Sequence, residues 1–202
     1  LAHGIRQLGL DVSPETQKKM LVYADLLEKW NRVYNLTSIR DPKKVVSTHF
    51  LDCLAVLPHL WPQRWLDVGS GAGLPGLLLA LAKPEWDFVL LDSNSKKTGF
   101  IQQAAIELAL HNVQVVCARV ESWQCSDKFD GIISRAYAET SLFVAQTRHL
   151  LGKSGRWAIM KTAPEAESGD LPPGIAVENT IPLQIPGVDA ARSLILLTQK
   201  VS

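Results

Sequence analysis

The chain has 202 residues, 47% of them hydrophobic, so one core of ordinary domain size can form without disulfides or metals. Its 21 basic and 20 acidic residues nearly cancel, and a net charge of +1 neither indicates a nucleic-acid-binding protein nor excludes a local basic patch. The three cysteines form no CxxC pair, which argues against a disulfide framework and a zinc site. Because no signal-peptide stretch or membrane-spanning apolar run occurs, we expect a soluble protein in a reducing cytoplasm.

Two helices are predicted ahead of the first strand. The first begins at Pro14, after an N-cap serine, and its apolar residues recur every three or four positions as far as Tyr34. The second begins after Asp41 and the proline that follows it, and carries an apolar stripe up to Pro58. These helices form a predicted N-terminal extension, residues 1–61.

From residue 62 onward, short apolar runs alternate with helical stretches. Strands are expected at 64–68, 87–92, 113–117, 130–134 and 155–161, and helices at 74–83, 96–110 and 140–151. This alternation predicts a parallel sheet that is covered on both faces. Two final strands, 174–183 and 192–199, have no helix between them and should form an antiparallel hairpin at the sheet edge. No repeat or flexible linker divides the chain, so we expect one domain whose core is residues 62–202.

Four glycines occur in the stretch GSGAGLPG, which directly follows the strand WLDV. A glycine-rich turn between a strand and a helix directs free backbone N–H groups and the positive helix end at a ligand. From Gly71 onward the stretch matches the dinucleotide-binding pattern GxGxxG. From Asp67 onward it matches the acidic-x-Gly-x-Gly-x-Gly pattern of methyltransferases, in which Gly69, Gly71 and Gly73 form the turn itself. A merely structural turn is the third interpretation.

Two aspartates next to this turn favour the methyltransferase interpretation. Asp67 is predicted at the strand tip, where a carboxylate would repel a pyrophosphate but suit the ammonium and sulfonium of S-adenosylmethionine. Asp92 ends the second strand, about 20 residues beyond the turn, where such folds use an acid to bind ribose hydroxyls. A dinucleotide-dependent oxidoreductase is a more distant alternative, because the chain has no second domain to bind its substrate.

The residues that two other methylation chemistries need are missing from the sequence. An enzyme that methylates cytosine C5 attacks with a cysteine that follows a proline, and none of the three cysteines does. An enzyme that methylates an exocyclic amine presents an Asp/Asn-Pro-Pro-aromatic motif after the fourth strand, where this chain has IISRAYAE. Methyl transfer is an in-line displacement, so alignment and electrostatics are the main tasks of the protein.

Basic residues follow several of the predicted strands at their carboxyl ends, where open α/β sheets bind ligands. They are Lys96, Lys97, Arg119, Arg135 and Lys161. Each alone is more typical of a solvated surface charge. Together they predict a positive rim around the donor pocket, which suits RNA because its phosphates bind lysine and arginine.

Six stretches of the chain resemble one family, the ribosomal small-subunit methyltransferases G, also called glucose-inhibited division protein B. They are WNRVYNLTSIRDPKKVVSTHFLDCLAVLP, LDVGSGAGLPGLLLA, LLDSNSKK, RVE, ISRA and PGVDAARSLIL, in order over nearly the whole chain. The resemblance implies a class I S-adenosylmethionine-dependent methyltransferase fold: α/β, with a Rossmann-like, mostly parallel seven-stranded sheet. It also implies methylation of guanine N7 at one position of 16S rRNA. Guanine N7 has a lone pair and no proton, so no general base is needed.

The resemblance also implies roles for individual residues. Donor contacts are implied at Gly69, Leu74, Val120, Glu121 and Arg135. Asn35, Arg40, His49 and Asp52 are implied near the pocket mouth, the first three as residues that bind RNA or position the base. For His49, a packed histidine bonded to Asp52 is an equal alternative, because the two are three residues apart on a helix.

We therefore expect a cytoplasmic, monomeric enzyme that takes S-adenosylmethionine as its methyl donor, needs no metal and acts on 16S rRNA or the small ribosomal subunit. Two alternatives remain open. A small-molecule methyltransferase would act without RNA, and a ribosome-assembly factor would bind the donor without turnover.

Overall fold

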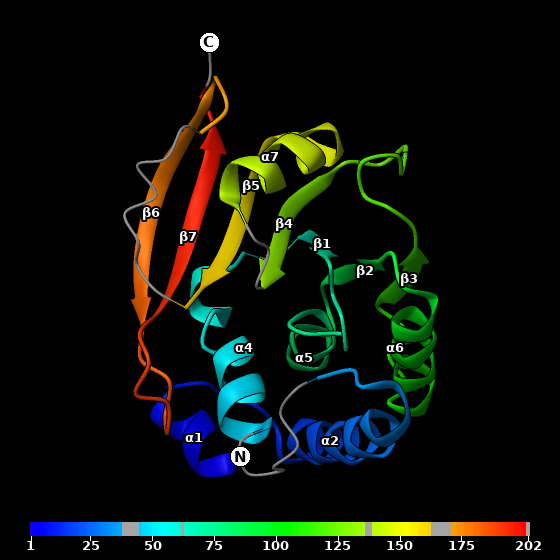
Figure 1. Cartoon of the computed structure of the whole chain (residues 1–202). Coiled ribbons are helices and arrows are strands. Elements are labelled where there is room, and N and C mark those ends of the chain that lie inside the picture. Colours follow the sequence, from blue (N-terminus) through cyan, green and yellow to red (C-terminus); the bar gives the residue numbers. More distant parts are fainter. Residues whose placement is uncertain (38–44, 62, 136–138, 163–170, 201–202) are drawn as a thin grey trace.

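The computed structural model describes residues 1–37, 45–61, 63–135, 139–162 and 171–200. Its centre is a seven-stranded sheet in the order β3-β2-β1-β4-β5-β7-β6, flanked by helices (Figure 1). The strands are β1 (Arg64–Val68), β2 (Asp87–Asp92), β3 (Val113–Cys117), β4 (Phe129–Arg135), β5 (Leu151–Lys161), β6 (Ile175–Leu183) and β7 (Arg192–Gln199). This architecture confirms the predicted class I methyltransferase fold.

The pairing of the strands agrees with the order of elements in the sequence. Strands β1 to β5 are parallel, whereas β7 runs antiparallel between β5 and β6. The predicted antiparallel hairpin at the sheet edge is therefore confirmed. The fifth strand begins at Leu151, four residues earlier than predicted, because Leu151 already pairs with Phe129 of β4.

Alternate residues of the strands enter two separate hydrophobic cores, one on each face of the sheet. In β1, the fully buried Trp65 belongs to one core and Leu66 to the other. The first core is covered by the N-terminal helices, α5 (Gly76–Ala82) and α6 (Ser95–Glu107). The second is covered by α7 (Thr140–Thr147) and the 3₁₀ turn η3 (Arg148–Leu150). Both faces are buried, as the parallel strands require.

The N-terminal extension differs in part from its prediction. Helix α2 (Pro14–Tyr34) has the predicted bounds, but α1 (Ala2–Gln7) was missed, because six residues give too little periodicity to recognise. The predicted second helix consists of the π-helical segment η1 (Val45–Leu51), the short α4 (Asp52–Leu54) and the 3₁₀ turn η2 (Leu57–His59). Its predicted start lies outside the described residues.

Helix α2 ties the extension to the glycine turn. The Ser13 hydroxyl caps the helix by accepting a hydrogen bond from the Thr16 N–H at 3.1 Å, and Pro14 occupies the first helical position. One buried face of α2 carries Tyr23, which stacks on Phe50 and donates its hydroxyl hydrogen to the Ala72 carbonyl. The extension therefore contacts the glycine turn directly, through Tyr23 of α2.

Candidate donor and RNA site

A cavity of about 330 Å³ opens at the carboxyl ends of β1, β2 and β4. It lies where open α/β sheets bind their ligands. Seven of the residues predicted for the site line it: Gly69, Asp92, Lys97, Arg119, Val120, Glu121 and Arg135. The fold thus brings together predicted donor residues from four separate stretches of the sequence.

The glycine turn has the predicted position but bonds differently from the prediction. Gly69, Gly71 and Gly73 all have positive φ, a conformation that glycine adopts without a steric penalty. The N–H groups of Gly69 and Ser70 donate to the Leu91 carbonyl at 2.8 and 3.1 Å, and that of Gly73 donates to the Ser70 carbonyl at 2.7 Å. Leu74 N–H donates to the same Ser70 oxygen at 2.9 Å. The expectation of free N–H groups aimed at a ligand is therefore wrong at these four positions.

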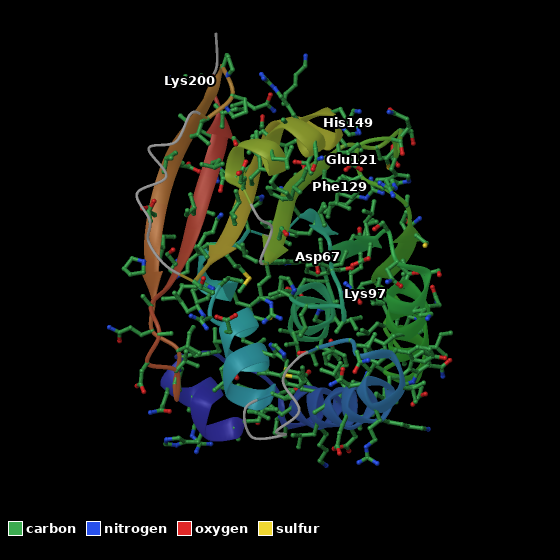
Figure 2. The ribbon with its side chains drawn as sticks, viewed as in Figure 1. Asp67, Lys97, Glu121, Phe129, His149 and Lys200 are labelled. Atoms are coloured by element: carbon green, nitrogen blue, oxygen red, sulfur yellow. The ribbon has the colours of Figure 1, made fainter. Side chains whose placement is uncertain are left out.

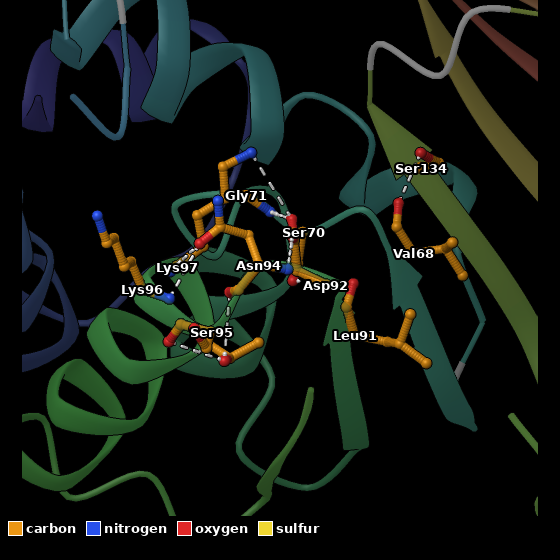
Figure 3. Close-up of polar contacts among 11 residues, drawn as sticks. Val68, Ser70, Gly71, Leu91, Asp92, Asn94, Ser95, Lys96, Lys97 and Ser134 are labelled. Carbon is orange, nitrogen blue, oxygen red and sulfur yellow. Dashed lines mark hydrogen bonds and ion pairs between the residues drawn. The ribbon is translucent and has the colours of Figure 1, made fainter. Parts of the chain in front are cut away.

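Asp92 connects the turn with α6. One carboxylate oxygen accepts the Gly71 N–H at 2.9 Å, and the other accepts the Asn94 N–H at 2.9 Å (Figure 3). Asn94 in turn caps α6 by accepting the N–H groups of Lys96 and Lys97. The Lys97 ammonium lies 3.9 Å from Asp92, so the acid that the sequence assigns to the ribose is held rigidly at the cavity wall.

Asp67 is not part of the cavity wall; its side chain contacts the start of α5, where the glycine turn ends. Its side chain is fully buried, and one oxygen accepts the Gly76 N–H at 2.8 Å, at the start of α5. The other oxygen has no hydrogen-bond partner among the described residues. Burial raises the pKa of Asp67 to about 7, against the opposing effects of the Gly76 N–H and of Arg135. The predicted contact between Asp67 and the donor stays a prediction.

Replacing Asp67 with asparagine is expected to make stability less dependent on pH. Between pH of about 4 and 7, folded Asp67 keeps a proton that the unfolded chain releases, so stability falls as the pH rises through this window. The full difference is about 4 kcal/mol, reached above pH 7. The gain in melting temperature of Asp67→Asn over wild type should therefore grow from pH 4 to 7. An equal difference at all pH values would contradict this, and Asp11→Asn serves as the surface control.

Arg135 ends β4 between the cavity and the N-terminal extension. Its Nη1 group donates to Nδ1 of His49 at 3.1 Å and lies 3.5 Å from a carboxylate oxygen of Asp52. The other Asp52 oxygen lies 3.2 Å from Nε of Arg192, the first residue of β7. Burial by itself lowers the pKa of Arg135, but nearby acidic groups, among them Cys53 and Asp52, outweigh it and raise that pKa. The guanidinium is therefore cationic at any working pH.

The tautomer of His49 follows from its partners. A guanidinium has no acceptor, so Nδ1 of His49 must accept, which makes the imidazole neutral with its proton on Nε2. That Nε2–H group then donates to the Thr37 hydroxyl at 2.8 Å. His49 is buried, as the packed alternative expects, but its hydrogen bonds are to Arg135 and Thr37, whereas Asp52 pairs with the two arginines.

The remaining predicted site residues lie outside the wall of this cavity. Gly71, Gly73 and Leu74 belong to the turn behind it, and Lys96 lies exposed at the start of α6. Asn35 is exposed and ends α2 in a left-handed conformation. Lys161 ends β5, and Arg40 lies outside the described residues.

Two residues were missed by the sequence analysis, one in the cavity wall and one beside Asp52. Arg192 pairs with Asp52, and the Ser134 hydroxyl donates to the Val68 carbonyl at 2.8 Å at the cavity wall (Figure 3). Both lie in stretches that carried the resemblance, PGVDAARSLIL and ISRA, which was the available signal.

The wall of the cavity carries charges of both signs: Lys97, Arg119 and Arg135 are basic, and Asp92 and Glu121 are acidic. Figure 2 shows Glu121 toward the α7 side of the sheet and Lys97 beside α6. Arg119 is exposed at the rim, whereas Glu121 accepts a hydrogen bond from Gln146 at 3.0 Å.

Among the described residues, no group of three or more histidine, cysteine, aspartate or glutamate side chains is arranged to bind a metal. None of the described helices is long and apolar enough to cross a membrane.

Comparisons with known proteins agree with this geometry. The family model "rRNA small subunit methyltransferase G" matches residues 16–195. The ribosomal RNA small subunit methyltransferase G of Laribacter hongkongensis is 48% identical over 98% of this chain and 96% of its own length. That of Neisseria meningitidis serogroup B is also 48% identical, over 99% and 97%.

Solved structures agree on the fold. A SAM-dependent methyltransferase from Aquifex aeolicus superposes with a TM-score of 0.58 at 18% identity, covering 78% of this chain and 93% of that one. At this identity the likeness concerns the fold alone, whereas the full-length matches to sequence relatives concern the family. The chain belongs to the rRNA small subunit methyltransferase G family.

Proposed function

We propose that the protein transfers a methyl group from S-adenosylmethionine to N7 of a guanine in 16S rRNA. The single observation that carries this proposal is the cavity at the carboxyl ends of β1, β2 and β4, in a chain of the family above. We further propose a single methyltransferase domain that acts in the cytoplasm as a monomer without a metal.

The residues of the cavity fit the donor. An acid at the end of β2 suits ribose hydroxyls, and Asp92 is held there by the turn and by α6. Val120 provides an apolar wall, and Gly69 allows close approach of the backbone. The Gly76 N–H is already bonded to Asp67, so the start of α5 is closed to a pyrophosphate. These features favour S-adenosylmethionine over a dinucleotide.

The proposed chemistry needs alignment and charge rather than proton transfer. When bound, S-adenosylmethionine supplies a methyl group on its sulfonium. The guanine N7 lone pair bonds to the methyl carbon as the C–S bond breaks, which leaves a neutral thioether and a cationic 7-methylguanine. No proton is lost, so no side chain has to act as a base. Lys97 and Arg119 at the rim attract the RNA backbone, and the rigid wall holds the reacting groups in line.

The test is transfer of labelled methyl from S-adenosylmethionine to 16S rRNA and to small-subunit particles from cells lacking the protein. We expect the label in 7-methylguanosine after nucleoside analysis. Label in a different nucleoside would overturn the assignment of the atom. Transfer to small molecules without RNA would favour the small-molecule alternative, and donor binding without any transfer would favour the assembly factor.

Because no base is required, we expect that no single substitution removes an ionisation from the pH dependence of the transfer rate. The sharpest case is His49→Asn, because His49 is the histidine that contacts Arg135. The measurement is the transfer rate of His49→Asn and of wild type at saturating substrates from pH 6 to 9. The two pH–rate profiles should have the same shape. A limb of the wild-type profile that disappears in His49→Asn would show that this histidine acts as a base.

A further inference from the structure

We propose that Asp52 is a positioning residue, which holds the guanidiniums of Arg135 and Arg192 together as a paired cationic site for a phosphate of the RNA that accepts the methyl group. This inference rests on the proposed function, which supplies an anionic acceptor. The resemblance implied only a place near the pocket mouth for Asp52, with no role beyond a bond to His49, and the residue lies outside the donor cavity wall.

The position of Asp52 is set by three parts of the chain. It begins α4 in the N-terminal extension and is 5% exposed. Its two oxygens point to different arginines, at 3.5 Å from Arg135 and 3.2 Å from Arg192. These arginine side chains are 22% and 14% exposed, so all three charges are largely removed from water.

The sheet order explains why the two arginines meet. Arg135 is the last residue of β4 and pairs with Met160 of β5, which in turn pairs with Leu194 of β7. Since β7 runs antiparallel, its first residues lie at the edge where β4 and β5 end. Two cations are thus brought to one edge, where they would repel one another without the carboxylate between them.

The charges in this cluster do not cancel. Two guanidiniums face one carboxylate, and His49 is neutral because it accepts from Arg135, so the cluster carries a formal charge of +1. A guanidinium has five N–H donors in a planar fork, and such forks bind phosphate through two parallel hydrogen bonds. The partly exposed pair beside the donor cavity therefore suits one phosphate of the acceptor.

The alternative is that Asp52 merely stabilises the fold by neutralising buried charge. Removing one partner of a buried ion pair is strongly destabilising, so loss of activity in a single variant would not separate the two roles. Coupling to the arginines is expected in both roles, so the two differ in what the substitution changes: a positioning residue lowers kcat/KM for RNA in protein that unfolds like wild type, whereas a structural residue lowers the free energy of unfolding. A positioning residue acts through the arginines, and its removal should matter little once an arginine is gone.

The experiment is a double-mutant cycle of Asp52→Asn with Arg135→Gln, in the methyl-transfer assay on 16S rRNA or small-subunit particles. We expect Asp52→Asn alone to lower kcat/KM for RNA by about tenfold or more, as for other charged partners of a binding site. In the Arg135→Gln background its effect should shrink to about twofold or less. The affinity for S-adenosylmethionine, measured by titration, should change less than the KM for RNA.

Controls separate positioning from folding. Glu178 lies on the edge strand β6, and its carboxylate is 2.9 Å from Arg156 of β5. Glu178→Gln removes this carboxylate and should keep wild-type kinetics. Where Asp52→Asn folds poorly, the double variant Asp52→Asn/Arg192→Gln restores the cluster charge of +1, and its comparison with Arg192→Gln reports the loss of Asp52 alone. Equal effects of Asp52→Asn in both backgrounds, or wild-type kcat/KM, would overturn the inference alone. An inactive wild-type protein would overturn the proposed function as well.

Discussion

Replacing Arg135 with alanine is expected to lower kcat/KM for methyl transfer to the RNA by about a hundredfold or more, the cost of removing one preorganised charged group from a site. The side chain lines the donor cavity, contacts His49 and pairs with Asp52, so one substitution removes part of the cavity wall and its contacts with the N-terminal extension. It also leaves the buried carboxylate of Asp52 facing a single arginine.

The measurement is steady-state methyl transfer, with thermal unfolding recorded for the same preparations. Arg135→Lys is the matched control, because it keeps the charge but loses the planar fork. We expect Arg135→Lys to recover part of the activity and Arg135→Ala to remain folded at the assay temperature. Activity of Arg135→Ala within about threefold of wild type would refute a role for this residue in the reaction.

Replacing Gly73 with alanine is expected to destabilise the protein by about 2–5 kcal/mol and to lower its melting temperature by roughly 4–20 °C. Gly73 has φ +85°, where a side chain costs about 1–2 kcal/mol. A Cβ atom there would also lie 2.4 Å from Leu77 of α5, an overlap that costs about 1–3 kcal/mol more. The donor cavity should lose affinity too, because Gly73 supports the turn.

Two other glycines make matched controls for thermal unfolding. Gly9 has φ +68° but open space around its Cβ position, so Gly9→Ala reports backbone strain alone and should cost less than Gly73→Ala. Gly99 lies in α6 with open space and no positive φ, so Gly99→Ala should stabilise by about 0.5–1 kcal/mol. If Gly73→Ala melts no lower than Gly9→Ala, the contact with Leu77 is not a constraint.

Local patterns in the sequence predicted most of the fold. Alternating apolar runs predicted five parallel strands, and the missing helix before Arg192 predicted the antiparallel hairpin. The cap and proline at the start of α2 predicted its first residue. The short α1 was missed, because six residues give too weak a periodicity. The residues of η1 were predicted as helix, but its π-helical geometry was not, because the pattern assumes 3.6 residues per turn.

Seven of the residues predicted for the site line the cavity, but the bonding of the glycine turn was not predicted. Glycine spacing and strand ends located the turn, Asp92 and Arg135 correctly, because a strand end puts its residues at one known edge of the sheet. Whether an N–H group is free, or a carboxylate buried, depends on neighbours that local sequence does not name. The internal bonds of the turn and the burial of Asp67 therefore came only from the tertiary structure.

By itself, then, the sequence determined the order and type of the elements, the location of the turn and the family. Only the tertiary structure placed Asp52, Arg135 and Arg192 together, although 83 residues separate the first two along the chain. The physical reason is that hydrophobic periodicity and turn chemistry act over a few residues, whereas ion pairs between distant segments depend on the order of strands in the sheet and on the packing of helices against it.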